Sequence, residues 1–149
     1  MDLKNLSITN TNLYKKLLGF LIKKGNIFKA KKVLDSTFLI VSKKTEFSTH
    51  AAIVALFRKL NSFVEVKRVR VRRRFVLVPF PICSKRRSYL IVKWIMYATR
   101  RVKRRCPFSE KLARELISIL KGSPSGTTRL RQANFSIALA NRSNTHFRW

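Results

Sequence analysis

The sequence predicts a mainly α-helical protein, a six-helix bundle with one protruding basic β-hairpin inserted between the third and fourth helices. Over most of the chain, apolar residues recur at steps of three and four, the period of a helix buried on one side. Between about residues 63 and 82 the pattern changes to β-branched residues in alternation, closed by Pro79 and Pro81. We therefore expect one helical domain over residues 11–149, preceded by a polar, flexible tail at 1–10.

The first three helices each have a cap and an apolar face. Thr11 or Asn12 begins the first helix, and Gly25 suits the left-handed turn that ends it. The second spans about 27–42, and Ser48 or Thr49 caps the third. The residues expected to face inward are Leu13, Leu17, Leu18, Phe20, Leu21, Ile27, Ala30, Leu34, Phe38, Val41, Ile53, Leu56, Phe57 and Leu60.

The hairpin segment has one irregularity and one turn. Valines occupy even positions at first and odd positions afterwards, so the alternation slips by one residue between Lys67 and Arg68. A bulge or a local twist is possible there. The turn is expected within the run Arg72 to Arg74.

Three more helices follow the hairpin. The fourth begins after Ser84 and continues through the basic cluster 100–105, and the fifth begins near Pro107 or Ser109. A loop over 122–126 separates the fifth from a last helix at about 128–143. The residues expected to face inward are Leu90, Ile91, Trp94, Ile95, Ala98, Leu112, Ala113, Leu116, Ile117, Leu120, Leu130, Ala133, Ile137 and Ala138.

Positive charge points to a polyanionic partner. The chain has 34 Lys and Arg against 6 Asp and Glu, a formal charge of +28 on 149 residues. Such a globule repels itself, whereas contact with phosphates turns the same charges into affinity through counterion release. An anionic membrane is the other general partner, but no apolar run approaches the roughly 18 residues of a spanning helix. Nucleic acid is therefore the favoured partner.

The candidate RNA-binding residues are cations gathered along the chain, together with the terminal tryptophan. Such side chains recognise RNA mainly through its backbone and shape. For the hairpin, a solvated edge that prevents sheet aggregation is the alternative. The candidates are Lys23, Lys24, Lys29, Lys31, Lys32, Lys67, Arg68, Arg70, Arg72, Arg73, Arg74, Lys85, Arg86, Arg87, Arg100, Arg101, Lys103, Arg104, Arg105, Arg129, Arg131, Arg142, Arg148 and Trp149.

Most aromatic residues fit core positions better than base-stacking positions. Core packing is expected for Phe20, Phe38, Phe57, Trp94 and Tyr97. Two aromatic residues are left open, because each either stacks on a base or covers the fold: Phe75 and Trp149.

Catalytic and metal-binding patterns are missing from the sequence. The acidic residues are scattered, there is no glycine-rich phosphate loop, and neither His50 nor His146 lies in a catalytic pattern. Cys83 and Cys106 form no CxxC pair, so we expect idle thiols in a reducing compartment and no metal or cofactor. The N-terminus resembles neither a secretory signal nor an import presequence. The expectation is a protein that is not an enzyme, with an RNA-processing enzyme and a free-standing basic RNA-binding protein, RNA chaperone or DNA-packaging protein as alternatives.

Several fragments, in order, resemble the small-subunit ribosomal protein seven family. A glycine with basic residues follows the first helix, Val64 to Lys67 enters the hairpin, and Val78-Pro79 leaves it. An Arg-Arg pair then precedes a Lys-Trp step, and the chain ends in the family's Ala-Asn-basic, His-aromatic-Arg-Trp pattern. These matches are Leu21 to Gly25, Val64 to Lys67, Val78-Pro79, Arg86-Arg87, Lys93-Trp94 and Ala140 to Trp149. The resemblance covers about residues 13–149.

This resemblance implies a structural protein that binds the 3′ major domain of small-subunit ribosomal RNA and organises the subunit head. It implies a hairpin near the exit-site tRNA and the mRNA path, and neighbouring head and platform proteins as partners. No small-molecule substrate, cofactor or membrane is implied.

Two features depart from a typical bacterial member or narrow the compartment. Many members have a Gly-Gly pair near the hairpin tip where this chain has Arg72-Arg73, so we expect a different or looser turn. The strong basicity is typical of a protein made inside an organelle, and the ending Asn141 to Trp149 is similar to mitochondrial members from plants and protists. We expect an organelle-encoded mitochondrial protein, with bacterial cytoplasm or plastid as alternatives.

Overall fold

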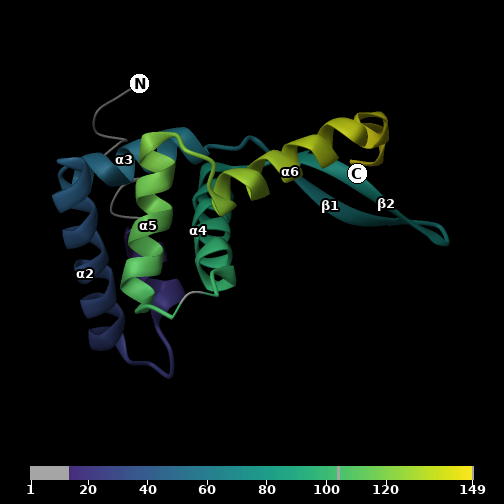
Figure 1. The fold of residues 1–149 in the computed structure, drawn as a ribbon. Helices are drawn as coiled ribbons and strands as arrows, with labels where there is room; N and C mark the ends of the chain where they lie inside the picture. Colours follow the sequence, from purple (N-terminus) through teal and green to yellow (C-terminus); the bar gives the residue numbers. More distant parts are fainter. Residues whose placement is uncertain (1–13, 104, 149) are drawn as a thin grey trace.

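Helices packed side by side form one part of the structure, and a two-stranded hairpin projects away from them (Figure 1). The computed structural model describes residues 14–103 and 105–148. The expected tail at 1–10, with Arg104 and Trp149, lies outside the described residues. The predicted fold class is confirmed, because the described part is mainly helical and the hairpin follows the third helix.

The helices lie close to their predicted positions. Asn26 and Ser48 cap the second and third helices, since the Asn26 side chain accepts from the Lys29 N–H and the Ser48 side chain from the Ala51 N–H. The fourth helix ends at Arg101, so it does not continue through the basic cluster as expected. The helical elements are residues 14–21, α2 (Ile27–Thr45), α3 (Thr49–Leu60), α4 (Ser84–Arg101), α5 (Phe108–Lys121), α6 (Gly126–Ala140) and the 3-10 helix η1 (Arg142–Phe147).

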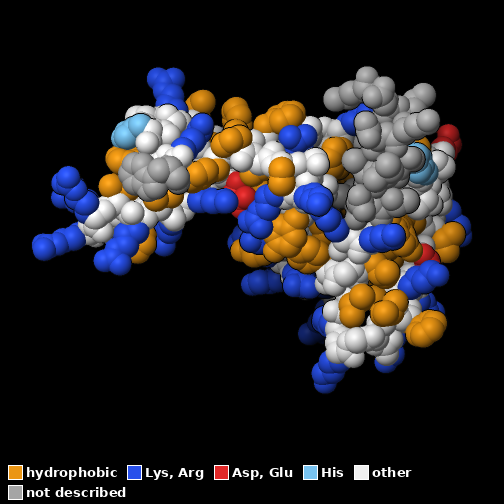
Figure 2. Space-filling view, turned by 180° about the vertical axis from the view of Figure 1, so that it is seen from behind, with side chains coloured by type: hydrophobic (Ala, Val, Ile, Leu, Met, Phe, Trp, Pro, Cys, Tyr) orange, Lys and Arg blue, Asp and Glu red, His pale blue; other side chains and the backbone are white. Residues whose placement is uncertain are grey.

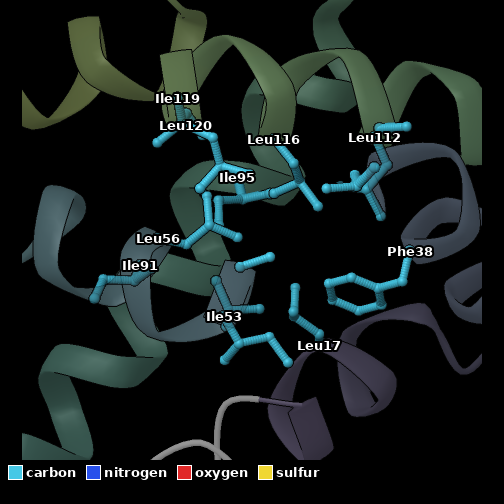
Figure 3. Close-up of a cluster of buried hydrophobic side chains, with 14 of the residues drawn as sticks. Leu17, Phe38, Ile53, Leu56, Ile91, Ile95, Leu112, Leu116, Ile119 and Leu120 are labelled. Carbon is cyan, nitrogen blue, oxygen red and sulfur yellow. The ribbon is translucent and has the colours of Figure 1, made fainter. Parts of the chain in front are cut away.

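The core lies among the first five helices (Figure 3). Apolar side chains from each of them are nearly inaccessible to solvent, among them Leu17, Leu34, Leu56, Ile95 and Leu116. Burying an aliphatic side chain of this size stabilises a fold by about 1.5–3 kcal/mol, so these positions hold the bundle together. At these five positions the periodicity predicted the core correctly.

Some residues that were predicted to face inward are exposed. Ile27 and Tyr97 are 53% and 52% exposed, because they lie beside the helix faces that pack on the core. In the last helix, Ala133 and Ile137 are also exposed. The reason is that α6 packs on α4 near Gly126 and then leaves the bundle to lie along the hairpin (Figure 1), so the bundle helices do not cover these two positions.

A buried carboxylate sets the start of α6. Glu115 on α5 accepts hydrogen bonds from the Thr127 backbone N–H at 2.7 Å and from the Thr127 hydroxyl at 2.6 Å. Next to it, a Cβ atom on Gly126 would lie only 3.0 Å from the Cβ of Ala98, so α6 approaches α4 more closely than a larger residue would allow. Ser125 caps the helix. These contacts direct α6 towards the hairpin.

The hairpin pairs without interruption. Strand β1 (Val64–Val71) runs antiparallel to β2 (Arg74–Pro81), and the register continues unbroken from Val64 opposite Pro81 to Val71 opposite Arg74. The possible bulge near Lys67 is therefore wrong. The slip in the sequence instead moves the valines from one face of the ribbon to the other, because side chains alternate strictly along a paired strand.

The two prolines of β2 fit this register. At the base of the hairpin, the Ile82 N–H donates to the Phe63 carbonyl, which fixes which pairs exchange backbone hydrogen bonds. By alternation, Pro79 and Pro81 occupy pairs that exchange none, so the missing proline N–H costs no ladder bond. Their carbonyls point outwards and remain accessible to other donors.

The hairpin tip is tight. Only Arg72 and Arg73 lie between the strands, and Arg72 has φ +53°. A positive φ at the first central residue alone is the pattern of a type II′ turn, whose twist suits a two-residue hairpin. Of the two expectations, a different turn or a looser one, the looser turn is wrong, because the strands pair up to Val71 and Arg74 and only two residues lie between them. A positive φ costs a non-glycine residue about 1 kcal/mol.

None of the helices in the described ranges is long and apolar enough to cross a membrane.

Candidate nucleic-acid interface

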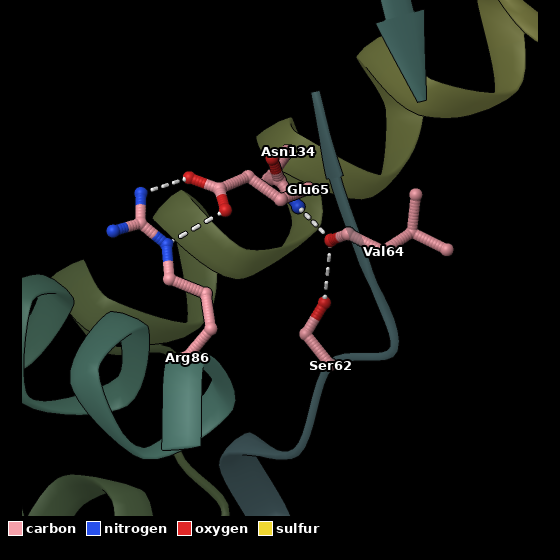
Figure 4. Close-up of polar contacts among 5 residues, drawn as sticks. All are labelled: Ser62, Val64, Glu65, Arg86 and Asn134. Atoms are coloured by element: carbon pink, nitrogen blue, oxygen red, sulfur yellow. Dashed lines mark hydrogen bonds and ion pairs between the residues drawn. The ribbon is translucent and has the colours of Figure 1, made fainter. Parts of the chain in front are cut away.

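An ion pair anchors the hairpin to the bundle (Figure 4). The Arg86 guanidinium at the start of α4 donates two hydrogen bonds to the Glu65 carboxylate on β1, at 2.6 and 2.8 Å. This contact holds the pKa of Glu65 below its ordinary value, although partial burial acts in the opposite direction. A bidentate pair fixes orientation as well as distance, so it sets the direction in which the hairpin leaves α4.

Hydrogen bonds from α6 secure the first strand. The Asn134 side-chain amide donates to the Val64 carbonyl at 2.9 Å, and the Ser62 hydroxyl donates to the same carbonyl at 3.1 Å (Figure 4). Arg131 donates to the Asn61 carbonyl at 3.1 Å, just before the strand. The base of β1 is thus held by α6 as well as by α4.

The second strand is held by η1. Asn144 donates to the Leu77 carbonyl at 3.2 Å, and Arg148 donates to the Pro79 carbonyl at 2.5 Å. These are the outward-facing carbonyls left by the register of the ladder. We call the hairpin, the end of α6 and η1 together the arm. It is tied across both strands rather than only at its base.

The exposed cations of the arm surround its outer half (Figure 2). Arg68 and Arg70 share one face of the ribbon with Phe75, and Lys67 lies on the other face, 5.4 Å from the centre of the Phe80 ring. All six predicted hairpin cations are exposed: Lys67, Arg68, Arg70, Arg72, Arg73 and Arg74. Because charge lies on both faces and at the tip, the arm presents positive charge in every direction around its end.

A second basic surface forms where distant segments meet at one end of the bundle. Lys23 and Lys29 come from the turn before α2 and from its first turn, whereas Arg100 comes from the end of α4. All three line one groove of about 400 Å³. Further exposed cations in the same segments are Lys24, Arg101, Lys103 and Arg105. We call this surface the basic bundle end; it joins two clusters that the sequence placed about 70 residues apart.

Four of the predicted RNA-binding arginines outside the hairpin contact it or the residues just before it. Arg86 pairs with Glu65, and the Arg87 guanidinium lies 4.4 Å from the centre of the Phe63 ring. Arg131 and Arg148 hold backbone carbonyls in the arm. The amino-acid sequence alone does not distinguish these arginines from cations that face solvent. The other predicted cations in these groups are exposed: Lys31, Lys32, Lys85, Arg129 and Arg142.

Aromatic residues add a feature that the sequence only partly indicated. Phe75 is 70% exposed, so it does not cover the fold and lies open beside the hairpin arginines. Phe28, which we did not single out from the sequence, is 89% exposed next to Lys29. Its position off the apolar face of α2 was the available signal. Exposed aromatic rings among cations suit contact with unpaired bases.

Three acidic groups in the described ranges make contacts that serve the fold. Glu65 and Glu115 hold the hairpin and α6, and Asp35 accepts a hydrogen bond from the Tyr14 hydroxyl at 3.1 Å. Within residues 14–103 and 105–148, no three His, Cys, Asp or Glu side chains gather as metal ligands would. Chemically, the arrangement offers binding to anions.

Comparison with known proteins gives one consistent match. The family model described as ribosomal protein S7p/S5e matches residues 2–142. The chain is 30% identical over 142 residues to small ribosomal subunit protein uS7 of Kosmotoga olearia, covering 95% of this chain and 90% of the relative. The uS7 proteins of Pediococcus pentosaceus and Borrelia duttonii are 29% and 32% identical, covering 95% and 78% of this chain and 90% and 73% of the relatives. The matched region includes the bundle, the hairpin and α6.

The Glu65–Arg86 pair makes stability depend on pH. Because the pKa of Glu65 is lowered in the folded chain, the pair stabilises the fold above the ordinary glutamate pKa of about 4.3 and loses this effect as pH falls through the folded value. We expect Glu65→Gln to lower the free energy of unfolding by about 1 kcal/mol at neutral pH. The deficit relative to wild type should vanish in acid, as measured by urea denaturation across pH.

Glu110→Gln is the matched control, because the Glu110–Arg114 pair is exposed and its atoms are 3.4 Å apart. It should change stability less than Glu65→Gln does. A Glu65→Gln deficit that stays constant well below the ordinary pKa would show that the ion pair is not its source.

Proposed function

The chain belongs to the ribosomal protein S7p/S5e family, and we propose that it is a structural constituent of the small ribosomal subunit. In this role it binds the 3′ major domain of the ribosomal RNA and helps to organise the subunit head. The observation that carries the proposal is the family match over nearly the whole chain. A formal charge of +28, displayed largely on exposed side chains, is what such a role requires.

The two basic surfaces suit contacts with different RNA segments. The basic bundle end is broad and lies on rigid helices, so it suits the backbone of folded RNA, which offers phosphates and shape rather than readable base edges. The arm instead carries its charge away from the core (Figure 1). A chain with both surfaces contacts RNA segments that lie far apart and holds them in a fixed relation.

The arm is suited to the exit-site tRNA and the mRNA path, which is where the family places its hairpin. Its tip cations and Phe75 are exposed, while its base is fixed by Glu65, Asn134 and Asn144. A firmly based arm with a charged tip reaches beyond the RNA bound by the bundle. Neighbouring proteins of the head and platform complete the set of partners.

We propose no catalytic role for the chain. Its family is one of ribosomal proteins rather than enzymes. Glu65 and Glu115 are engaged in contacts that hold the fold.

The mitochondrial ribosome is the compartment that we propose, with an organelle-encoded chain. The support is the ending Asn141 to Trp149, which is similar to that of plant and protist mitochondrial members, and the strong basicity. The relatives named above are bacterial, so bacterial cytoplasm and plastid remain the alternatives.

Co-sedimentation tests the function and the compartment together. Ribosomes purified from isolated mitochondria should contain the chain in their small subunits, and it should stay bound through a moderate salt wash because many phosphate contacts act at once. Recovery only in soluble fractions would contradict a ribosomal role and favour a free-standing RNA-binding protein. Recovery with plastid or bacterial subunits instead would leave the function intact and overturn the compartment.

Replacing four arm arginines separates the two surfaces. The variant Arg70→Ala, Arg72→Ala, Arg73→Ala, Arg74→Ala should keep its binding to a head-domain RNA fragment, because the basic bundle end is unchanged. Its contacts with tRNA or mRNA in assembled subunits should be altered, as measured by crosslinking.

The matched control removes the same number of charges from the other surface: Lys23→Ala, Lys24→Ala, Lys29→Ala and Arg100→Ala. This variant should weaken head-RNA binding by roughly tenfold or more, since each phosphate contact contributes to affinity. Complete loss of RNA binding in the arm variant would show that the arm, and not the bundle, carries the primary contact.

A further inference from the structure

The groove at the basic bundle end has apolar walls and a cationic rim. It lies between the end of the first helix, the start of α2, the end of α4 and the start of α5, and its volume of about 400 Å³ falls in the range of small-ligand sites, roughly 300–1,000 Å³. The rim residues are Lys23, Asn26, Lys29 and Arg100. The apolar walls comprise Phe20, Leu21, Ala30, Val33, Met96 and Phe108.

The composition of the groove limits what it can hold. Three of its residues are cations and none is a carboxylate, so a purely apolar side chain gains nothing from the rim. A ligand that matches both parts has a flat or compact apolar body attached to negative charge. A nucleotide within RNA has this form, because each base has an apolar face and a phosphate on either side.

Local geometry supports the same ligand. The Asn26 side-chain oxygen is used to cap α2, accepting from the Lys29 N–H at 3.1 Å, which leaves the side-chain NH₂ as a donor for an acceptor on a base edge. The Arg100 guanidinium lies 3.5 Å from the Phe20 carbonyl, so it is held at the rim. Arginine there can bind a phosphate or stack on a base.

We propose that this groove binds one unstacked base of the RNA, while Lys23, Lys29 and Arg100 contact its flanking phosphates. The inference rests on the RNA-binding function proposed above and adds a site to it. The basic bundle end then recognises a single-stranded or bulged position instead of any stretch of phosphate backbone.

Met96 gives a direct reporter of the groove. Met96 is 2% exposed and lines the groove. Met1 is the only other methionine in the chain. A full-length chain with ¹³C-labelled methionine methyl groups therefore has two signals, which Met96→Leu assigns. A base in the groove places an aromatic ring near the Met96 methyl group and shifts its signal.

Two probes of equal length and charge separate stacking from electrostatic attraction. One is the single-stranded RNA hexamer of adenosine, and the other is an abasic ribose-phosphate hexamer. We expect the adenosine hexamer to bind roughly tenfold more tightly and to shift the Met96 methyl signal. The abasic hexamer should bind through charge and leave that signal in place.

Three outcomes would overturn the inference. Binding of the adenosine hexamer without a shift at Met96 would leave RNA binding intact and show that the base lies elsewhere. A stronger shift from a short acidic peptide containing phenylalanine would make the groove a protein-docking site. Failure of both hexamers to bind would contradict the RNA-binding function itself, and the groove proposal with it.

A substitution that fills the groove tests whether the base binds there. Ala30 is 4% exposed and lines the groove, so Ala30→Leu should abolish the preference for the adenosine hexamer while leaving abasic binding unchanged. Ala133→Leu adds the same bulk at an exposed position on α6 and should keep the preference. Retained preference in a folded Ala30→Leu chain would rule out the groove as the base site.

Discussion

Repulsion among its own positive charges is the constraint on which the structure of this chain depends. With 34 basic and 6 acidic side chains, internal ion pairs cannot balance the charge, and the part of the chain that the structure describes has two of them, Glu65–Arg86 and Glu110–Arg114. The bundle therefore needs an extensive apolar core, and the cations need an external polyanion. Core and charge are separated in space, since the cations lie outside the layer of buried leucine and isoleucine side chains.

The few acidic and amide groups have effects out of proportion to their number. Glu65 fixes the hairpin to α4, and Glu115 fixes the start of α6. Asn134 and Asn144 then tie α6 and η1 to the two strands. Without these contacts the arm would be a charged ribbon joined at its base, and two-stranded hairpins are only marginally stable alone. The contacts fix the direction of the arm, so its positive charges lie at defined positions relative to the bundle.

Much of the bundle could be predicted from the sequence, because a helix buried on one side has apolar residues at steps of three and four. The positions of Leu34, Leu56 and Leu116 in the core show this plainly. The hairpin was also located correctly, since β-branched alternation between helices is a strong signal. The slip near Lys67 left a bulge open as one possibility, because a change of buried face and a bulge produce the same pattern in sequence.

What the sequence could not show depends on contacts between distant residues. The path of α6 is decided by Glu115 against Thr127 and by the close approach of Gly126 to Ala98. The basic bundle end exists only because the turn before α2 meets the end of α4. In the same way, nothing in the run of cations distinguished Arg86, which holds the hairpin, from Lys85, its exposed neighbour.

The salt dependence of RNA binding tests the central claim most directly. The full chain would be titrated with a head-domain fragment of small-subunit ribosomal RNA at a series of monovalent salt concentrations. If about ten phosphates are neutralised, the logarithm of the binding constant should fall with the logarithm of salt concentration with a slope of roughly −7 or steeper. A binding constant that hardly changes with salt would contradict the account, because neutralisation of ribosomal RNA could not then be the role of this charge.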